Sequence, residues 1–123
     1  MMAYLSVAAG GAIGAVMRYF FGQIVPPAKS GFPYTTLMVN IVGAVLIGVC
    51  YVLIVERLGE NNYWRELIMV GILGGFTTFS TFSLEAVQLW QSGQIMLTTM
   101  YVVLSIFFCI LATLIAMSLT RLL

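Results

Sequence analysis

The chain has 123 residues, of which 62% are hydrophobic and only 7% are charged, and its formal net charge is +1. Soluble domains carry a charge on roughly a quarter of their residues, so this composition excludes an ordinary soluble domain and indicates a membrane protein. The small net charge also argues against nucleic acid as a partner, because nucleic-acid-binding domains present a strongly basic surface.

Four long apolar runs predict four membrane-spanning helices, at about residues 3–25, 35–55, 64–90 and 95–119. Each run is long enough, at about 1.5 Å per residue, to cross a hydrocarbon layer of about 30 Å. Only short polar or Pro/Gly-rich stretches separate the runs. We therefore expect an all-α membrane protein with a single four-span domain over residues 1–123, in contact with the lipid bilayer.

The first run contains Arg18 and has no positive residue ahead of it. A secretory signal carries its charge before the apolar stretch, so we interpret this run as a span rather than a cleaved leader. Small residues share a face with Arg18, and a second small-residue pair follows in the third run. They are Gly10, Gly14 and Gly22 in the first run and Gly71 and Gly75 in the third. Such faces let helices approach closely in lipid, either within one subunit or between two.

The second run places Thr36, Asn40 and Gly43 on one helical face. The Asn40 amide offers two donors and an acceptor, and an uncharged donor in a pore can bind an anion without trapping it. The alternative is a structural hydrogen bond between helices, and Asn40 alone does not decide between these interpretations.

The third run is over-long, and its middle, residues 74–83, reads GGFTTFSTFS. Adjacent glycines weaken a helix and hydroxyl groups need partners in hydrocarbon, so we expect two half-helices around a break near the middle. Phe76, Phe79 and Phe82 recur every three residues, hence roughly on one face, with Thr and Ser between them. The positive edges of their rings can face an anion, although an ordinary packing face is the common alternative.

The fourth run carries a polar stripe made of Thr98, Tyr101, Ser105, Cys109 and Thr113. Tyr101 and Ser105 offer hydroxyl donors about one turn apart. The alternative is that these side chains bond their own backbone, as Ser and Thr in membrane helices often do. Glu85 in the third run and Arg18 are the only charges well inside spans, and we expect them to be structural, either paired or facing a vestibule.

No catalytic constellation is present in the sequence. The chain has no histidine and no phosphate-binding loop, so we expect no enzyme. Cys50 and Cys109 lie far apart, without the spacing of a zinc site, and are interpreted as small buried apolar residues.

The bias of Lys and Arg between the two sides of the predicted bundle is weak. Because the span count is even, Arg57, Arg65 and Arg121 share the side of the termini, while Lys29 lies opposite, joined by Arg18 if that side chain snorkels outward. The orientation of a membrane protein follows the Lys/Arg bias of its short loops. Because this bias is weak here, we infer that the chain inserts both ways round. Most oligomers are closed and symmetric, and the natural assembly is then an antiparallel, dual-topology homodimer.

Three segments together make the chain resemble the Fluc (CrcB) family of bacterial fluoride channels. They are GGAIG at residues 10–14 followed by Arg18-Tyr19, TLMVNIVG at 36–43, and GILGGFTTFSTFS at 71–83. The third segment is highly specific, and all four spans fall in the family's order. The resemblance implies a fluoride-selective channel in the bacterial inner membrane, whose passive efflux reduces fluoride toxicity.

The resemblance also implies an antiparallel homodimer with two pores. The matching fluoride path consists of Asn40, Phe79, Phe82, Tyr101 and Ser105, with Thr36 as a further donor. Arg18 matches a vestibule arginine. The backbone carbonyls of Gly74 and Thr77 match ligands of a structural sodium ion (Na+) at the dimer interface. Cys109 stands where a family hydroxyl can occur.

Two alternatives to a fluoride channel are a small dual-topology multidrug exporter and a structural membrane subunit. Such exporters carry an acidic residue in the first span, where this chain has Arg18. A structural subunit explains the small-residue faces but leaves the clustered hydroxyls and ring edges without a purpose.

Overall fold

The structure is a computed structural model that describes residues 1–25, 31–59 and 63–123. Its elements, in chain order, are α1 (Met2–Ile24), α2 (Tyr34–Cys50), η1 (Tyr51–Glu56), η2 (Arg65–Leu73), α3 (Gly74–Phe76), α4 (Phe79–Gln91) and α5 (Ile95–Leu122). The elements η1 and η2 have the wider turns of a π-helix. The described chain therefore has the expected all-α class.

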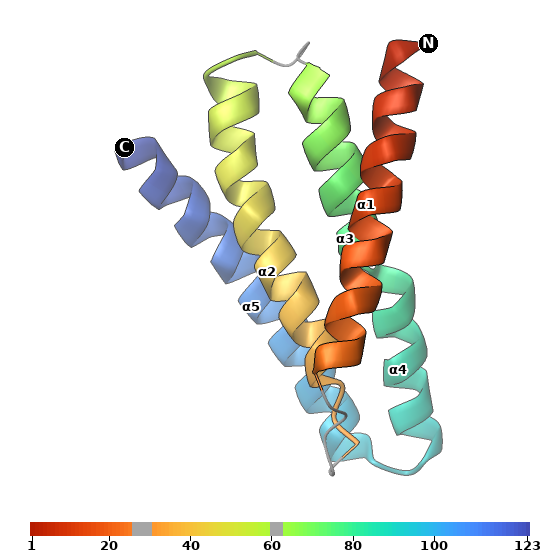
Figure 1. The fold of residues 1–123 in the computed structure, drawn as a ribbon. Helices are drawn as coiled ribbons and strands as arrows, with labels where there is room; N and C mark the ends of the chain where they lie inside the picture. Colours follow the sequence, from red (N-terminus) through yellow and green to blue (C-terminus); the bar gives the residue numbers. More distant parts are fainter. Residues whose placement is uncertain (26–30, 60–62) are drawn as a thin grey trace.

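Four helical stretches of the described chain are long and apolar enough to cross a membrane: Met2–Ile24, Tyr34–Glu56, Arg65–Gln91 and Ile95–Leu122. They run alternately up and down, and both termini lie at the same end of the bundle (Figure 1). The four predicted spans are thus confirmed as helices of sufficient length and apolarity. Lys29 and most of the Pro-rich turn around it lie outside the described residues.

α1 lies along η2 and α3, and glycines make this close approach possible (Figure 1). A Cβ atom added to Gly10 would lie 2.3 Å from the Leu67 carbonyl oxygen, and one added to Gly14 would lie 2.0 Å from the Ile72 carbonyl oxygen. Only a residue without a side chain fits there. Of the two interpretations of the small-residue face, packing within one subunit is therefore confirmed for Gly10 and Gly14. Gly22 takes no part, because nothing lies within 4 Å of its added Cβ.

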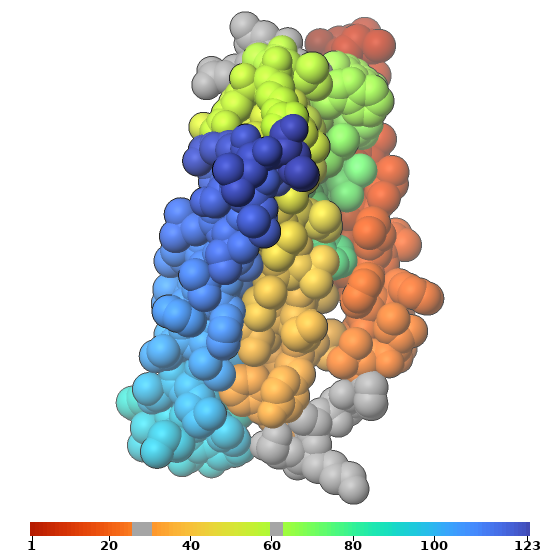
Figure 2. Space-filling view, turned by 90° about the vertical axis from the view of Figure 1, so that its left-hand side faces the viewer, coloured from red at the N-terminus to blue at the C-terminus, as the bar shows by residue number. Residues whose placement is uncertain are grey.

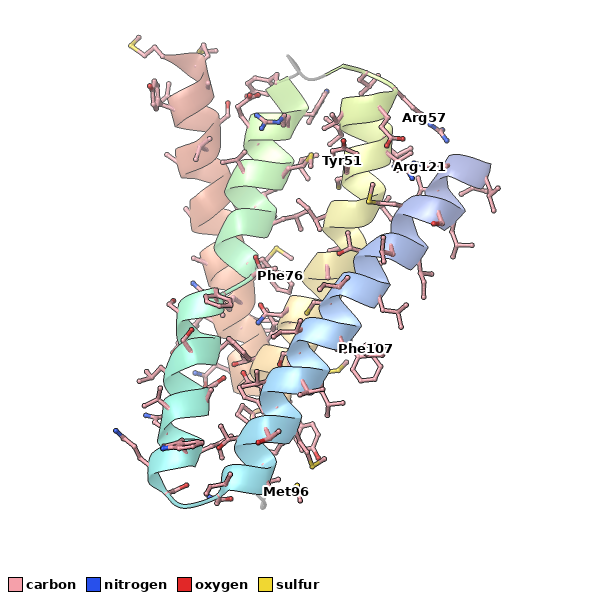
Figure 3. The ribbon with its side chains drawn as sticks, turned by 180° about the vertical axis from the view of Figure 1, so that it is seen from behind. Tyr51, Arg57, Phe76, Met96, Phe107 and Arg121 are labelled. Carbon is pink, nitrogen blue, oxygen red and sulfur yellow. The ribbon has the colours of Figure 1, made fainter. Side chains whose placement is uncertain are left out.

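α2 packs along α5, and Figure 2 shows the two helices side by side over much of their length. Their midsection is held by the Thr113 hydroxyl, which donates to the Ala44 carbonyl oxygen at 3.1 Å. At the end near the C-terminus, Arg121 donates to both carboxylate oxygens of Glu56. Arg57 lies beside it (Figure 3) and donates to the Thr120 carbonyl oxygen at 2.9 Å.

The connection between α4 and α5 is a tight turn. Gly93 adopts a φ of 79°, a left-handed conformation that glycine enters without steric strain. The Ser92 hydroxyl donates to the Leu89 carbonyl oxygen at 2.8 Å and so caps the end of α4. This turn sets α4 and α5 side by side and brings their polar residues together.

Replacing Gly14 by Ala tests the close approach of α1 to η2. The added methyl group would lie 2.0 Å from the Ile72 carbonyl oxygen. The two backbones must then move apart, and we expect a loss of about 1–3 kcal/mol of stability. Gly22→Ala is the matched control on the same helix and should be neutral or slightly stabilising. The midpoint of thermal unfolding in detergent measures both variants, and equal midpoints would contradict this packing.

Candidate functional site

Between α3 and α4 the backbone leaves the helical conformation for two residues, Thr77 (φ −79°, ψ 156°) and Thr78 (φ −150°, ψ 115°). We call this the Thr77–Thr78 step. The Thr77 N–H and hydroxyl both donate to the Leu73 carbonyl oxygen, at 3.0 and 2.8 Å. The Thr78 hydroxyl accepts the Thr81 N–H at 3.2 Å and thereby caps the start of α4. The step lies two residues beyond the glycine pair, not at the glycines themselves.

Asn40 of α2 holds the step in place. Its side-chain N–H donates to the Thr78 carbonyl oxygen at 3.1 Å, and its side-chain oxygen accepts the Thr78 N–H at 2.9 Å. One amide thus bonds both backbone groups of Thr78, whose N–H has no partner within a helix. The structural hydrogen bond considered for Asn40 is therefore present. The amide carries a second N–H, so a role in an ion path stays a prediction.

The step also deprives two carbonyl groups of their usual donors. In a continuous α-helix the Gly74 carbonyl would accept the Thr78 N–H, and the Thr77 carbonyl would accept the Thr81 N–H. Here the Thr78 N–H donates to Asn40, and the Thr81 N–H donates to the Thr78 hydroxyl. The two carbonyls expected to bind sodium are therefore among those that the step deprives of their helical donors. Carbonyl oxygens are ligands that suit a hard cation.

An open groove of about 450 Å³ runs along the step between α2, η2, α4 and α5. We call it the central groove. Four of the predicted path residues line it: Asn40, Phe79, Phe82 and Ser105. Gly74, Thr77, Thr78 and Cys109 line it as well. None of its lining residues among the described part of the chain carries a charge. The structure thus gathers neutral polar groups and aromatic rings from three helices around one space.

The spacing of the phenylalanines in residues 74–83 suggested that they share one face, but they do not. Phe79 and Phe82 lie together, with ring centroids 5.3 Å apart, and the Phe82 ring continues to Tyr101 at 5.2 Å. Phe76 instead packs edge-on against Phe21 of α1 at 5.7 Å and is buried there. The prediction is wrong for Phe76 because the extended step changes the helical phase between Phe76 and Phe79. Phe79 is 78% exposed, so this chain leaves one side of its ring uncovered.

The polar stripe of α5 divides into bonded and unbonded side chains. The Thr98 hydroxyl donates to the Gln94 carbonyl oxygen and the Thr113 hydroxyl to the Cys109 carbonyl oxygen, both at 3.0 Å. The alternative of bonding to their own helix is therefore confirmed for these two threonines. The Ser105 hydroxyl is buried and has no hydrogen-bond partner among the described residues. Ser105 thus borders the central groove with a buried hydroxyl that still lacks a partner.

Glu85 is the acceptor that links Thr36 and Tyr101. The Thr36 hydroxyl donates to one carboxylate oxygen at 2.8 Å, and the Tyr101 hydroxyl donates to the other at 2.7 Å. Tyr101 is fully buried, packed against Phe82 and, edge-on, against Phe32. These two predicted path residues do not line the central groove. Tyr101 lies against the Phe82 ring, and the hydroxyl groups of both residues are turned to the carboxylate.

A second cavity, of about 720 Å³, lies between α1, α2 and α4, where Figure 2 shows α1 standing apart from α2. Arg18, Thr36 and Glu85 line this side cavity. No ion pair joins Arg18 to Glu85 among the pairs of the described residues, so both charges face a shared space instead of each other. Thr78 borders both the side cavity and the central groove. The step is therefore the wall between the two spaces.

Comparison with known proteins identifies the family. Residues 5–117 match the family described as CrcB-like protein, Camphor Resistance (CrcB). The chain belongs to the CrcB family. A "Fluoride-specific ion channel FluC" of Saccharophagus degradans is 46% identical over 98% of this chain and 91% of its own length. A protein of the same name from Hahella chejuensis is 46% identical over 94% and 92%, and one from Erythrobacter litoralis is 47% identical over 99% and 94%.

This CrcB chain is a multi-pass membrane protein, given its four apolar helices and its channel relatives. Sequence reasoning missed one feature of its site, the role of Glu85 as the common acceptor for Thr36 and Tyr101. A signal was present, because an acid inside an apolar span must find donors on neighbouring helices. The half-buried state of Cys50 and Cys109 also differs from the full burial that their apolar surroundings suggested.

Replacing Asn40 by Leu tests how this CrcB chain holds the step. The Thr78 N–H then loses its partner, and a buried unpaired group costs about 1–3 kcal/mol. We expect a clearly lower midpoint of thermal unfolding in detergent. Thr99→Val is the control, because the exposed Thr99 hydroxyl bonds only the Ile95 carbonyl of its own helix, at 3.0 Å. An Asn40→Leu variant as stable as Thr99→Val would show that other groups serve Thr78.

Proposed function

We propose that this chain is a fluoride-selective ion channel. It lets fluoride leave the cell passively across the bacterial inner membrane and so reduces fluoride toxicity. Relatives that match nearly the whole chain carry the name fluoride-specific ion channel. The structural observation that carries the proposal is the central groove, in which the Asn40 amide, the Ser105 hydroxyl and the Phe79 and Phe82 rings meet without a charged group. A channel of this kind performs no catalysis.

Neutral donors suit fluoride for a physical reason. Fluoride is small and strongly hydrated, so a selective path must replace its water with hydrogen-bond donors and must still let the ion leave. The Ser105 hydroxyl has no competing partner among the described residues, and the Asn40 amide has an N–H beyond the one that serves Thr78. The ring edges of Phe79 and Phe82 add weak positive potential. A larger halide, which holds its water less tightly, gains less from these groups.

The side cavity is the proposed vestibule of this path. Arg18 lines it and would raise the local concentration of anions. An ion that enters there meets Thr36 and then Thr78, which borders the central groove as well. The Thr36 and Tyr101 hydroxyl groups both donate to Glu85 in this structure. To bind the ion, each hydroxyl would have to turn its hydrogen bond from the carboxylate to fluoride.

One chain does not enclose the path. The central groove is open along one side, and the Phe79 ring within it is 78% exposed. We infer that a second copy closes the groove in an antiparallel, dual-topology homodimer, as the weak Lys/Arg bias suggests. The stretch Arg65–Gln91 would then act as one span broken at the Thr77–Thr78 step, with the steps of the two copies meeting near the dimer axis.

The proposed dimer offers a site for sodium at its centre. The carbonyl oxygens of Gly74 and Thr77 have lost their helical donors, and two copies related by a twofold axis supply this pair twice. The described residues contain no cluster of three or more His, Cys, Asp or Glu side chains, so backbone oxygen is the ligand at hand. A bound sodium would add positive charge where two sets of carbonyl dipoles converge and would hold the copies together.

Fluoride efflux from vesicles tests the proposed function. Purified protein in liposomes loaded with fluoride should release the ion, read with a fluoride electrode, and should nearly exclude chloride under the same gradient. The reason is that the groove offers donors matched to a small, strongly hydrated anion. Leakage no faster than from empty vesicles would refute the channel.

Aromatic variants connect this flux to the groove. We expect Phe79→Ile and Phe82→Ile each to reduce fluoride efflux while the dimer stays intact on size-exclusion chromatography, because an aliphatic side chain has no positive ring edge. Phe107→Ile is the matched control, since Phe107 projects from α5 away from the other helices (Figure 3). If both groove variants conduct like the control, the two rings serve packing alone.

Removal of sodium tests the central site. Replacing Na+ by N-methyl-D-glucamine during purification and assay should weaken dimerisation or fluoride efflux, because a large organic cation cannot fit between backbone carbonyls. Restoring sodium should restore the measured property. Indifference of both flux and oligomeric state to the exchange would argue against sodium at Gly74 and Thr77.

A further inference from the structure

The central groove contains a thiol that the proposed function does not use. Cys109 lies on α5 one helical turn after Ser105 and lines the groove. The other cysteine, Cys50, is the last residue of α2 and is not among the groove residues. Both are half-buried and neither forms a disulfide. The chain therefore has one thiol inside the proposed path and one outside it.

The neighbourhood of Cys109 points to a ligand. The Ser105 residue is 7% exposed, and its hydroxyl lacks a partner among the described residues while lining the same groove. On the other side, the Thr113 hydroxyl is occupied, donating to the carbonyl oxygens of Cys109 and Ala44 at 3.0 and 3.1 Å. Along this part of the stripe, a buried, unpartnered hydroxyl at Ser105 and the thiol of Cys109 thus lie beside the groove on successive turns.

We propose that Cys109 makes the central groove a binding site for a soft, thiol-seeking metal cation, and that occupation of this site blocks fluoride passage. The blocking effect rests on the proposed function, whereas the binding does not. Sulfur ligands select soft metals, and the hard hydroxyl of Ser105 adds a weak second contact. The apolar walls of the groove, which include Ile106 and Ile110, favour a neutral or singly charged species over a strongly hydrated ion.

Methylmercury chloride has the required chemistry and needs only one thiol. In the reaction a sulfur–mercury bond forms at Cys109 while the S–H and Hg–Cl bonds break, and a proton and a chloride ion leave. No oxidant or reductant takes part. The product places a metal–methyl group in a groove of about 450 Å³ that it shares with Asn40 and Phe82. The bulky group then occupies the space through which the ion must pass.

Two cysteine variants separate this site from non-specific thiol chemistry. Wild-type protein and Cys50→Ala should both lose fluoride efflux down to the rate of empty vesicles after treatment with methylmercury chloride, and excess dithiothreitol should restore it. Cys109→Ser should keep its own untreated rate after the same treatment. Each variant is compared with itself, so any effect of the substitution on the untreated rate cancels. Intact mass spectrometry shows which cysteine carries the adduct.

Three results would overturn the proposal: Cys109→Ser blocked as fully as wild type, a Cys109 that takes up no methylmercury, or a modified Cys109 with unchanged flux. Absence of fluoride flux before treatment overturns the proposed function and the block together. Normal flux that survives modification overturns the block alone, so the two failures are distinguishable.

Discussion

Backbone groups that leave a helix within hydrocarbon must find hydrogen-bond partners inside the protein, because lipid offers none. Thr78 is the residue on which this constraint falls, and Asn40 meets it by serving both its N–H and its carbonyl. The other features of the site follow from this exchange. Asn40 takes the donor of the Gly74 carbonyl, the Thr78 hydroxyl takes the donor of the Thr77 carbonyl, and the step sets α4 in a new helical phase beside the central groove.

Close packing on either side of the step brings Asn40 within hydrogen-bonding distance of Thr78. A Cβ atom added to Gly43, one turn along α2 from Asn40, would lie 2.1 Å from the Thr77 methyl carbon. The absent side chain therefore makes room for the threonine, just as Gly14 makes room for η2 on the other face. Glycine thus makes room both for the Thr77–Thr78 step and for the contact between α1 and η2. The glycines allow the backbones to lie close together, and Asn40 can then reach the backbone of Thr78 by hydrogen bonds.

The sequence allowed the spans, their number and the unusual character of residues 74–83 to be predicted, because length and apolarity are local properties. The place of the step was not predictable, since it depends on Asn40 and Gly43 of another helix and a single sequence does not give the register between helices. The prediction for Phe76 was wrong for the same reason, because it assumed a continuous helical phase through the step. Four residues of the predicted path share the groove, while Thr36 and Tyr101 turn to Glu85, and their role in ion passage stays a prediction.

Both ends of the polypeptide emerge at the same end of the bundle (Figure 1). A gene duplication that joined two copies directly, tail to head, would therefore hold both repeats in one orientation. A fused protein with its repeats inverted would need a linker that itself traverses the bilayer an odd number of times. For the antiparallel pair proposed above, the location of the termini thus favours two separate chains unless evolution adds a further helix between them.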